Sequence, residues 1–209
     1  MAPESPQPAR VPATDKLDEL RPAVQGCRAC ALWEGTTQAV FGEGRAQARL
    51  MLVGEQPGDR EDREGHPFVG PAGRVLDNGL ERAGIDRTEV YVTNVVKHFR
   101  YKARGKRRIH QTPERAHIAA CAPWLEAELR IVAPAALVCL GATAARALLG
   151  SGARVGRDRG QPLDSDLAPL VTLTTHPSAI LRVPDAGDRE AAMAAFVSDL
   201  GQVARWLAA

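Results

Sequence analysis

Short apolar runs alternate with amphipathic segments along most of the chain. Four runs rich in Val and Leu predict β-strands, at residues 49–54, 90–96, 135–141 and 169–175. Apolar residues recur at helical spacing between and after these runs, at residues 71–84, 113–132, 142–150 and 189–208. Such alternation is typical of a parallel sheet that is covered on both faces. The pattern therefore predicts an α/β fold, a three-layer α/β/α sandwich around a central four-stranded parallel sheet.

The N-terminal segment differs from the rest of the chain. Residues 1–13 are rich in Pro and Ala and contain no apolar core, so we expect a disordered tail and not a signal peptide. Residues 14–209 have a length that suits one domain. The longest apolar stretch, 131–150, is interrupted by Pro134 and Arg146 and predicts no membrane span. We therefore expect a cytoplasmic protein, and because nothing in the pattern indicates an oligomer, we expect a monomer.

Polar segments rich in Gly and Pro follow the ends of the predicted strands. The first strand is followed by GEQPGDREDREGHPF, the second runs into Asn94, and the fourth runs into HPS. In parallel sheets, ligands bind beyond the carboxyl ends of the strands. The sequence therefore predicts that three segments, far apart along the chain, converge on one cleft.

Positive charge is concentrated in one segment of the chain. Residues 97–108 contain seven Lys and Arg and no acidic residue, whereas the net charge of the whole chain is only +2. A solvated loop is one interpretation of this segment, and a surface that contacts a polyanion is the other. The segment leads to His110, just before a predicted helix with Thr112 as its N-cap and Pro113 at its first position.

The four cysteines could hold a metal centre. Cys27 and Cys30 form a Cys-x-x-Cys pair, whereas Cys121 and Cys139 lie far away in the sequence. Zinc sites usually have two compact pairs, but four thiolates can hold an iron–sulfur cluster from scattered positions. Cys139 lies in an apolar run and on its own would be interpreted as a structural cysteine. From spacing alone, zinc and an iron–sulfur cluster both remain open.

Several motifs, found in order between about residues 27 and 205, together resemble a known family. They are the Cys-x-x-Cys pair, GEQPGDREDREGHPFVGPAG, VYVTNVVKHFR, PAALVCLGATAA and THPSAILR. This set resembles the iron–sulfur uracil-DNA glycosylases of the family 4/5-like type. The resemblance implies a 4Fe-4S iron–sulfur cluster held by Cys27, Cys30, Cys121 and Cys139, and uracil-containing DNA, single-stranded or double-stranded, as the partner.

Uracil must be flipped out of the DNA stack before its glycosidic bond can be reached. In the family, the residue that matches Phe68 stacks on the base. The Asn94 amide can donate to O4 of uracil and accept from N3–H, whereas cytosine presents the inverse pattern. His176 and backbone amides near Gln56 would stabilise negative charge at O2. Ser178 would lie against the DNA phosphates.

Acidic residues follow the first predicted strand. We expect Glu55 to act as a base or to balance a sugar cation, and Asp59 to orient water or the sugar. The alternative for both is a loop acid near a helix start. Glu61, Asp62 and Glu64 are expected to be solvated.

The segment after Asn94 departs from ordinary members of the family. It is longer and more basic, and Lys106, Arg107, Arg108, Ile109 and His110 spell KRRIH. This loop resembles that of the UdgX-type subclass, and the resemblance implies that the protein excises uracil and becomes covalently joined to the DNA through His110. Glycosidic cleavage passes through an oxocarbenium-like sugar, which the nearest nucleophile captures.

The basic residues of the KRRIH motif have expected roles of their own. Lys106, Arg107 and Arg108 would bind DNA phosphates, and Arg108 would also anchor the loop.

Three functions are therefore under consideration. The first is a single-turnover glycosylase that ends covalently bound to DNA through His110. The second is a conventional uracil-DNA glycosylase that turns over and leaves abasic sites. The third is a non-catalytic iron–sulfur module that binds DNA through residues 97–108.

Overall fold

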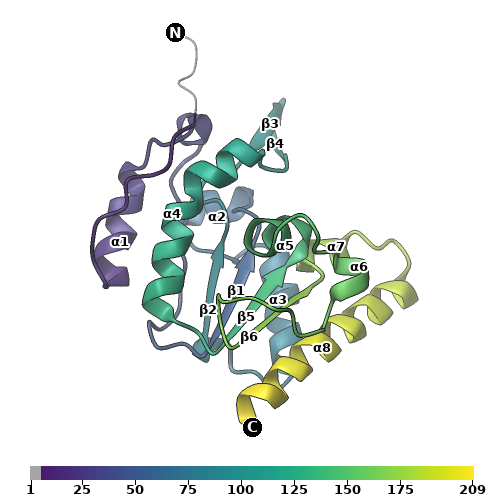
Figure 1. Cartoon of the computed structure of the whole chain (residues 1–209). Helices are drawn as coiled ribbons and strands as arrows, with labels where there is room; N and C mark the ends of the chain where they lie inside the picture. Colours follow the sequence, from purple (N-terminus) through teal and green to yellow (C-terminus); the bar gives the residue numbers. More distant parts are fainter. Residues whose placement is uncertain (1–5) are drawn as a thin grey trace.

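A parallel four-stranded sheet forms the centre of the computed structural model, which describes residues 6–209 (Figure 1). The strands are β1 (Leu50–Gly54), β2 (Val90–Asn94), β5 (Ala136–Leu140) and β6 (Leu170–Thr174), in the order β2-β1-β5-β6. All four are buried along their whole length, because helices cover both faces. This confirms the predicted α/β fold and the four predicted strands.

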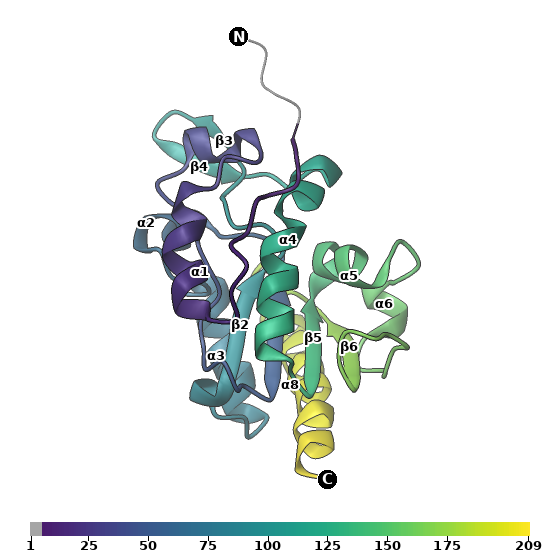
Figure 2. The ribbon, with the colours of Figure 1, turned by 60° about the vertical axis from the view of Figure 1, so that its left-hand side comes forward.

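Two layers of helices cover the sheet (Figure 1 and Figure 2). Side chains of α1 (Leu17–Ala23), α4 (Arg115–Val132) and α5 (Gly141–Leu149) share one apolar core with one face of the sheet. Side chains of α3 (Pro71–Arg82), α7 (Pro177–Leu181) and α8 (Ala186–Ala208) form a second core on the opposite face. Short elements complete the described part: α2 (Asp59–Glu64), α6 (Val155–Asp158), and the 3-10 turns η1 (Val24–Gly26), η2 (Ala31–Gly35) and η3 (Arg87–Glu89).

The basic segment is a β-hairpin that projects from the sheet layer (Figure 1). Its strands, β3 (Tyr101–Arg104) and β4 (Arg107–His110), are antiparallel, and Tyr101 pairs with His110. Gly105 lies in the turn with φ of 58°, a conformation that costs glycine little. The expectation of a loop is therefore corrected: His110 is the last residue of a hairpin strand.

The start of α4 also differs from the prediction. The N-cap is Glu114 and not Thr112, and the helix begins at Arg115. The Glu114 amide donates to His117 Nδ1 at 3.1 Å, so His117 serves the helix start. The Thr112 carbonyl instead accepts from the Arg100 guanidinium.

The described part of the expected tail is held in place. Residues 1–5 lie outside the described residues, but the Gln7 amide donates to Ala29 O at 2.9 Å and the Ala9 amide donates to Ala120 O at 2.8 Å. Ala9 is buried in the core on the α4 side of the sheet. Residues 6–13 thus differ from the disordered tail that their composition predicts. Within residues 6–209, no helix has the length and apolarity that a membrane crossing requires.

Candidate active site

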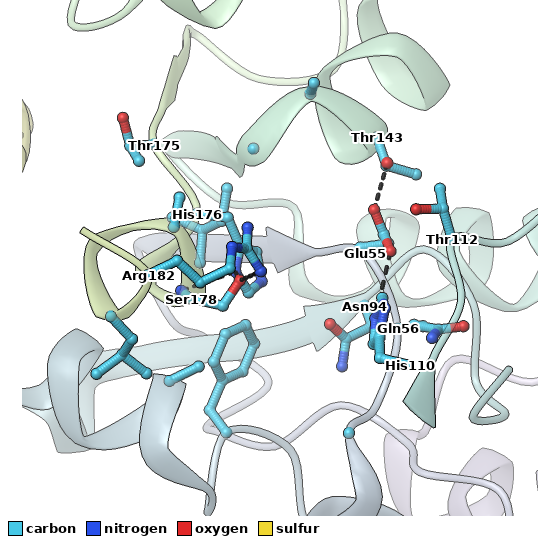
Figure 3. A pocket seen from close by; sticks show the side chains of 18 of the residues that line it. Glu55, Gln56, Asn94, His110, Thr112, Thr143, Thr175, His176, Ser178 and Arg182 are labelled. Carbon is cyan, nitrogen blue, oxygen red and sulfur yellow. Dashed lines mark hydrogen bonds and ion pairs between the residues drawn. The ribbon is translucent and has the colours of Figure 1, made fainter. Parts of the chain in front are cut away.

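A cavity of about 720 Å³ opens at the C-terminal edge of the sheet (Figure 3). All the residues predicted to take part in catalysis or base binding line this cavity: Glu55, Gln56, Asp59, Phe68, Asn94, His110 and His176. Ser178 also lines it, whereas Lys106, Arg107, Arg108 and the four cysteines do not. The segments that follow β1, β2 and β6 therefore converge on one cavity, as predicted.

The side chains of Asn94, Phe68 and His176, all of which line the cavity, pack tightly around Gly54. A Cβ atom at Gly54 would lie 2.5 Å from Asn94 Oδ1, 2.8 Å from Phe68 Cζ and 3.5 Å from His176 Nε2. The aromatic ring of Phe68 and the imidazole of His176 are stacked, with 6.2 Å between their centroids. A planar ring that enters the cavity beside these three side chains can meet an aromatic face, an amide and an imidazole at once.

His176 is held as a neutral imidazole with its Nε2 toward the cavity floor. It is the N-cap of α7, and its Nδ1 accepts from the Ser178 amide at 3.1 Å. Since Nδ1 accepts, the neutral ring carries its proton on Nε2. Burial, followed by the charges of His110 and Arg182, lowers the pKa of His176 to about 4. The Ser178 hydroxyl also lies 2.9 Å from Nδ1, so it faces His176.

His110 lies at the mouth of the cavity beside a carboxylate. Its Nε2 is 3.4 Å from Glu55 Oε1, and its side chain is 49% exposed. The other oxygen, Glu55 Oε2, accepts from the Thr143 hydroxyl, so Glu55 lies between Thr143 and His110 (Figure 3). Burial lowers the pKa of His110, Glu55 opposes this effect, and Arg182 adds to it. His110 is thus favoured as a neutral ring.

Arg108 fastens the hairpin to α2. Its guanidinium donates to Asp59 Oδ1, and to Asp62 Oδ2 at 2.6 Å. It also lies over the rings of Phe99 and Tyr101, 5.4 and 5.1 Å from their centroids. Both the charge and the planar surface of Arg108 are therefore used within the protein.

Two acids of α2 are buried, contrary to the expectation that they are solvated. Asp62 has no exposed surface, and its carboxylate accepts from the Thr37 amide as well as from Arg108. Glu61 is 8% exposed and accepts from the Gly58 and Gly70 amides. Glu64 alone matches the expectation, since it is partly exposed and pairs with Arg60 on the surface. The sequence of this acidic segment alone does not show which of its side chains the fold buries.

Gln56 joins the two ends of the hairpin, a role that its motif did not indicate. Its Nε2 donates to Arg100 O and Gln111 O, each at 3.1 Å, and its Oε1 accepts from the Arg100 amide at 3.0 Å. The side chain is therefore occupied, and only the backbone of Gln56 is available to a base.

The positive charges of residues 97–108 divide into two groups. Lys97 has no exposed surface and forms an ion pair with the equally buried Glu128. By contrast, Lys102, Arg104, Lys106 and Arg107 are exposed. The charge available to a polyanion is thus smaller than the sequence indicates, and it lies at the tip of the hairpin.

Three of the four cysteines lie close together. The Trp124 indole donates to Cys27 Sγ and the Lys97 amide donates to Cys121 Sγ, each at 3.3 Å. Burial raises the pKa of Cys121 to about 12 against the effect of Lys97, and the thiols of Cys27 and Cys30 are near enough to raise it further. Within residues 6–209, however, no three His, Cys, Asp or Glu side chains are arranged around one metal position.

Cys139 does not belong to this group. It lies in the middle of β5, paired with Val53 on one side and Leu173 on the other. Burial alone raises its pKa to about 12. The structure therefore supports the interpretation of Cys139 as a structural cysteine of the sheet and not its expected role as a fourth ligand.

His98 is a better candidate for the fourth ligand than Cys139, although the sequence alone did not single it out. It directly follows Lys97, whose amide contacts Cys121, and it is 5% exposed. Burial and then the charge of Arg28, which lies between Cys27 and Cys30 in the chain, lower the pKa of His98 to about 4. A buried neutral imidazole that directly follows a residue in contact with a thiol has the chemistry of a metal ligand.

Comparison with known proteins places this geometry in a family. Residues 41–201 match the Uracil DNA glycosylase superfamily. The chain belongs to the uracil DNA glycosylase superfamily. Its cavity at the sheet edge, with Phe68, Asn94 and His176 around Gly54, is thus the pocket of a superfamily member.

Three relatives carry the name "Type-4 uracil-DNA glycosylase". The protein of Pyrobaculum aerophilum is 35% identical over 80% of this chain and 86% of its own length. That of Thermotoga maritima is 41% identical over 76% of this chain and 80% of its own. That of Sulfurisphaera tokodaii is 41% identical over 61% of this chain, which spans only 55% of that relative.

Proposed function

We propose that this member of the superfamily excises uracil from DNA and is then joined to the DNA through His110. The observation that carries the proposal is the place of His110, at the mouth of the pocket with its Nε2 3.4 Å from Glu55. The names of the three relatives support the first half of the proposal, the excision of uracil.

The flipped base would enter the cavity beside Phe68, Asn94 and His176. There the Phe68 ring offers a stacking face, and the Asn94 amide can donate to O4 of uracil and accept from N3–H. Cytosine carries a donor and an acceptor in the opposite places, so it would leave the 3% exposed Asn94 amide unpaired. Selectivity for uracil over cytosine follows from this mismatch.

Cleavage breaks the bond between C1′ of the sugar and N1 of uracil. The bonding electrons leave with uracil as an anion, and the sugar becomes an oxocarbenium-like cation. His176 would donate from Nε2 to uracil O2 as negative charge develops there. Because its Nδ1 already accepts from Ser178, the ring can fill this role as a neutral donor.

Capture forms a bond between C1′ and a ring nitrogen of His110. The lone pair of the neutral imidazole supplies the electrons, and the ring becomes a cation that the Glu55 carboxylate compensates. Uracil keeps the electron pair of the broken bond, so charge balances without another reactant. In a conventional glycosylase, water would occupy the position of His110 and lose its proton to Glu55.

The hairpin would hold the DNA while Arg108 holds the hairpin. The exposed Lys106 and Arg107 can neutralise phosphates, in a manner that weakens with salt. Arg108 is bound to Asp59 and Asp62, so its role is to anchor the strand that ends in His110. Asp59 then acts by positioning Arg108. Ser178 lies beside His176, so we expect it to orient the His176 ring and not to bind phosphate.

If a cluster binds, Cys27, Cys30, Cys121 and His98 would be its ligands, although their side chains are not arranged around one metal position in this structure. The N–H groups of Trp124 and Lys97 already point at two of the sulfurs, as donors do around cluster thiolates. When bound, a 4Fe-4S cluster would tie the N-terminal segment to α4 as a structural cross-link.

A denaturing gel tests the proposed function. A single-stranded oligonucleotide that contains one uracil is incubated with the protein and boiled in detergent, with a thymine oligonucleotide as control. A shifted band with uracil only supports covalent capture. Alkali-cleavable product in excess of protein, without that band, would instead establish a turnover glycosylase, and salt-sensitive binding indifferent to uracil would leave only a DNA-binding module.

A further inference from the structure

We propose that Thr143 is a positioning residue for capture, because its hydroxyl holds the Glu55 carboxylate in the orientation that serves His110. This inference rests on the proposed function and extends it to a residue of α5, which contributes no group to the base or the sugar. Thr143 lines the pocket at its buried side and is 7% exposed.

Glu55 lies between Thr143 and His110 and contacts both of them (Figure 3). The Thr143 hydroxyl donates to Glu55 Oε2, which leaves Glu55 Oε1 facing His110 Nε2 at 3.4 Å. In the described part of the chain, these two contacts are the polar contacts of the Glu55 side chain. Without the hydroxyl, no other hydrogen-bond donor among residues 6–209 would hold the carboxylate toward His110.

The backbone around Thr143 is suited to this task because its position is fixed. Helix α5 follows directly on β5, through Gly141 with φ of 87°. A Cβ atom at Gly141 would lie 2.8 Å from His176 Cβ, so the start of α5 packs closely against the residue that faces uracil O2. The nine-residue helix also directs its N-terminal partial positive charge toward the carboxylate.

The orientation of Glu55 matters most after the glycosidic bond has begun to break. Positive charge then develops on the sugar and passes to the imidazole when the new bond forms. A carboxylate that turns away leaves both cations without compensation in a partly desolvated site. Loss of the Thr143 hydroxyl should therefore slow capture without weakening the binding of DNA.

The test compares three variants by the first-order rate of covalent band formation on a saturating uracil oligonucleotide. Thr143→Val removes the hydroxyl and keeps the shape, and Thr143→Ser restores it. Thr172→Val is the matched control, because Thr172 is a buried threonine of β6 whose hydroxyl has no hydrogen-bond partner within residues 6–209. Affinity is measured separately with a thymine oligonucleotide, and thermal unfolding reports whether each variant folds.

Thr143→Val is expected to slow capture about tenfold or more, which is the effect expected when one hydrogen bond to a charged group is lost. Affinity for the thymine oligonucleotide should stay within about twofold, and Thr143→Ser and Thr172→Val should capture within about threefold of the parent. The pH midpoint of the rate should also move down in Thr143→Val. His110 faces Glu55, His176 and Arg182, and of these only Glu55 raises its pKa.

Two results would overturn the role of Thr143. One is a Thr143→Val protein with the rate and pH midpoint of the parent. The other is a Thr143→Ser protein that is as slow as Thr143→Val, since the hydroxyl would then not be what matters. If the parent leaves only abasic sites, the proposed capture has failed; the same variants are then compared by the rate of abasic-site formation, and equal rates would overturn the inference.

Discussion

Arg108 donates to Asp62, a carboxylate without exposed surface, across the gap between the hairpin and α2. The contact joins Nη1 to Oδ2 at 2.6 Å, and the same carboxylate accepts from the Thr37 amide. Two residues further along β4 lies His110. The position of the proposed nucleophile therefore depends on a buried charge that never meets the substrate.

The Arg108→Gln variant should unfold more easily and capture uracil-DNA more slowly. It leaves Asp62 buried without its cation, which costs about 3 kcal/mol in cases of this kind. The neighbouring Arg107 is exposed, so Arg107→Gln should change stability by less than about 0.5 kcal/mol. Urea unfolding and the rate of covalent band formation are measured on both. Equal stability of the two variants would show that Arg108 does not anchor the hairpin.

The rate of capture should fall in acid solution with a midpoint below pH 6.5 and should level off at higher pH. His110 attacks as the neutral ring, and burial, opposed by Glu55 and assisted by Arg182, sets its pKa below the ordinary 6.5. The reactive form is thus already the majority at pH 6.5 and is lost as the pH falls through the lowered pKa. His176, with a pKa of about 4, stays neutral over the same range. Rates of band formation from pH 5 to 8.5 check this, and a midpoint at pH 7 or above would contradict it.

Gly54→Ala should abolish most uracil excision while DNA binding persists. The added methyl group would lie 2.5 Å from Asn94 Oδ1 and 2.8 Å from Phe68 Cζ, so the two side chains proposed to face the base would have to move. We expect a loss of about 100-fold or more in the excision rate, equivalent to about 3 kcal/mol. Gly152→Ala is the control, since a Cβ there meets nothing within 4 Å. Excision is followed by release of uracil, and an unchanged rate would place the base elsewhere.

The sheet and the convergence on one cleft could be predicted because each depends on local patterns. The runs that became β1 and β2 are mostly apolar and are buried throughout. The polar segments that follow parallel strands meet at one edge of the sheet. The hairpin was missed because its two strands are polar and mostly exposed, so no alternation of apolar residues marked them.

Burial of charged residues could not be predicted in this way. Asp62 stands in a run of acids, and Lys97 in a run of bases, yet both have no exposed surface because distant segments supply their partners. Composition does not show which residue forms an ion pair with a charged side chain when the two lie far apart in the sequence, as Lys97 and Glu128 do, 31 residues apart. The expectation that Cys139 is a ligand has the same origin, since four cysteines suggested four ligands, whereas the fold brings Cys27, Cys30 and Cys121 together and places Cys139 in β5.

The cysteine variants should separate ligands from structural residues. Cys139→Ala should retain iron and the brown absorption of a cluster and lose about 1–2 kcal/mol of stability as a buried side chain is shortened. Cys121→Ala should lose iron, and His98→Ala should lose it or bind it weakly. Iron content and the visible spectrum of the purified variants are compared. Loss of the cluster from Cys139→Ala with retention in His98→Ala would reverse the assignment.

Mass spectrometry of the boiled protein–DNA product tests the central claim most directly. After nuclease and protease digestion, the adduct should consist of one deoxyribose phosphate without uracil, attached to the peptide at His110. His110→Gly should give no adduct and should leave abasic DNA in its place. An adduct on another residue, or a covalent band that persists in His110→Gly, would contradict capture by His110.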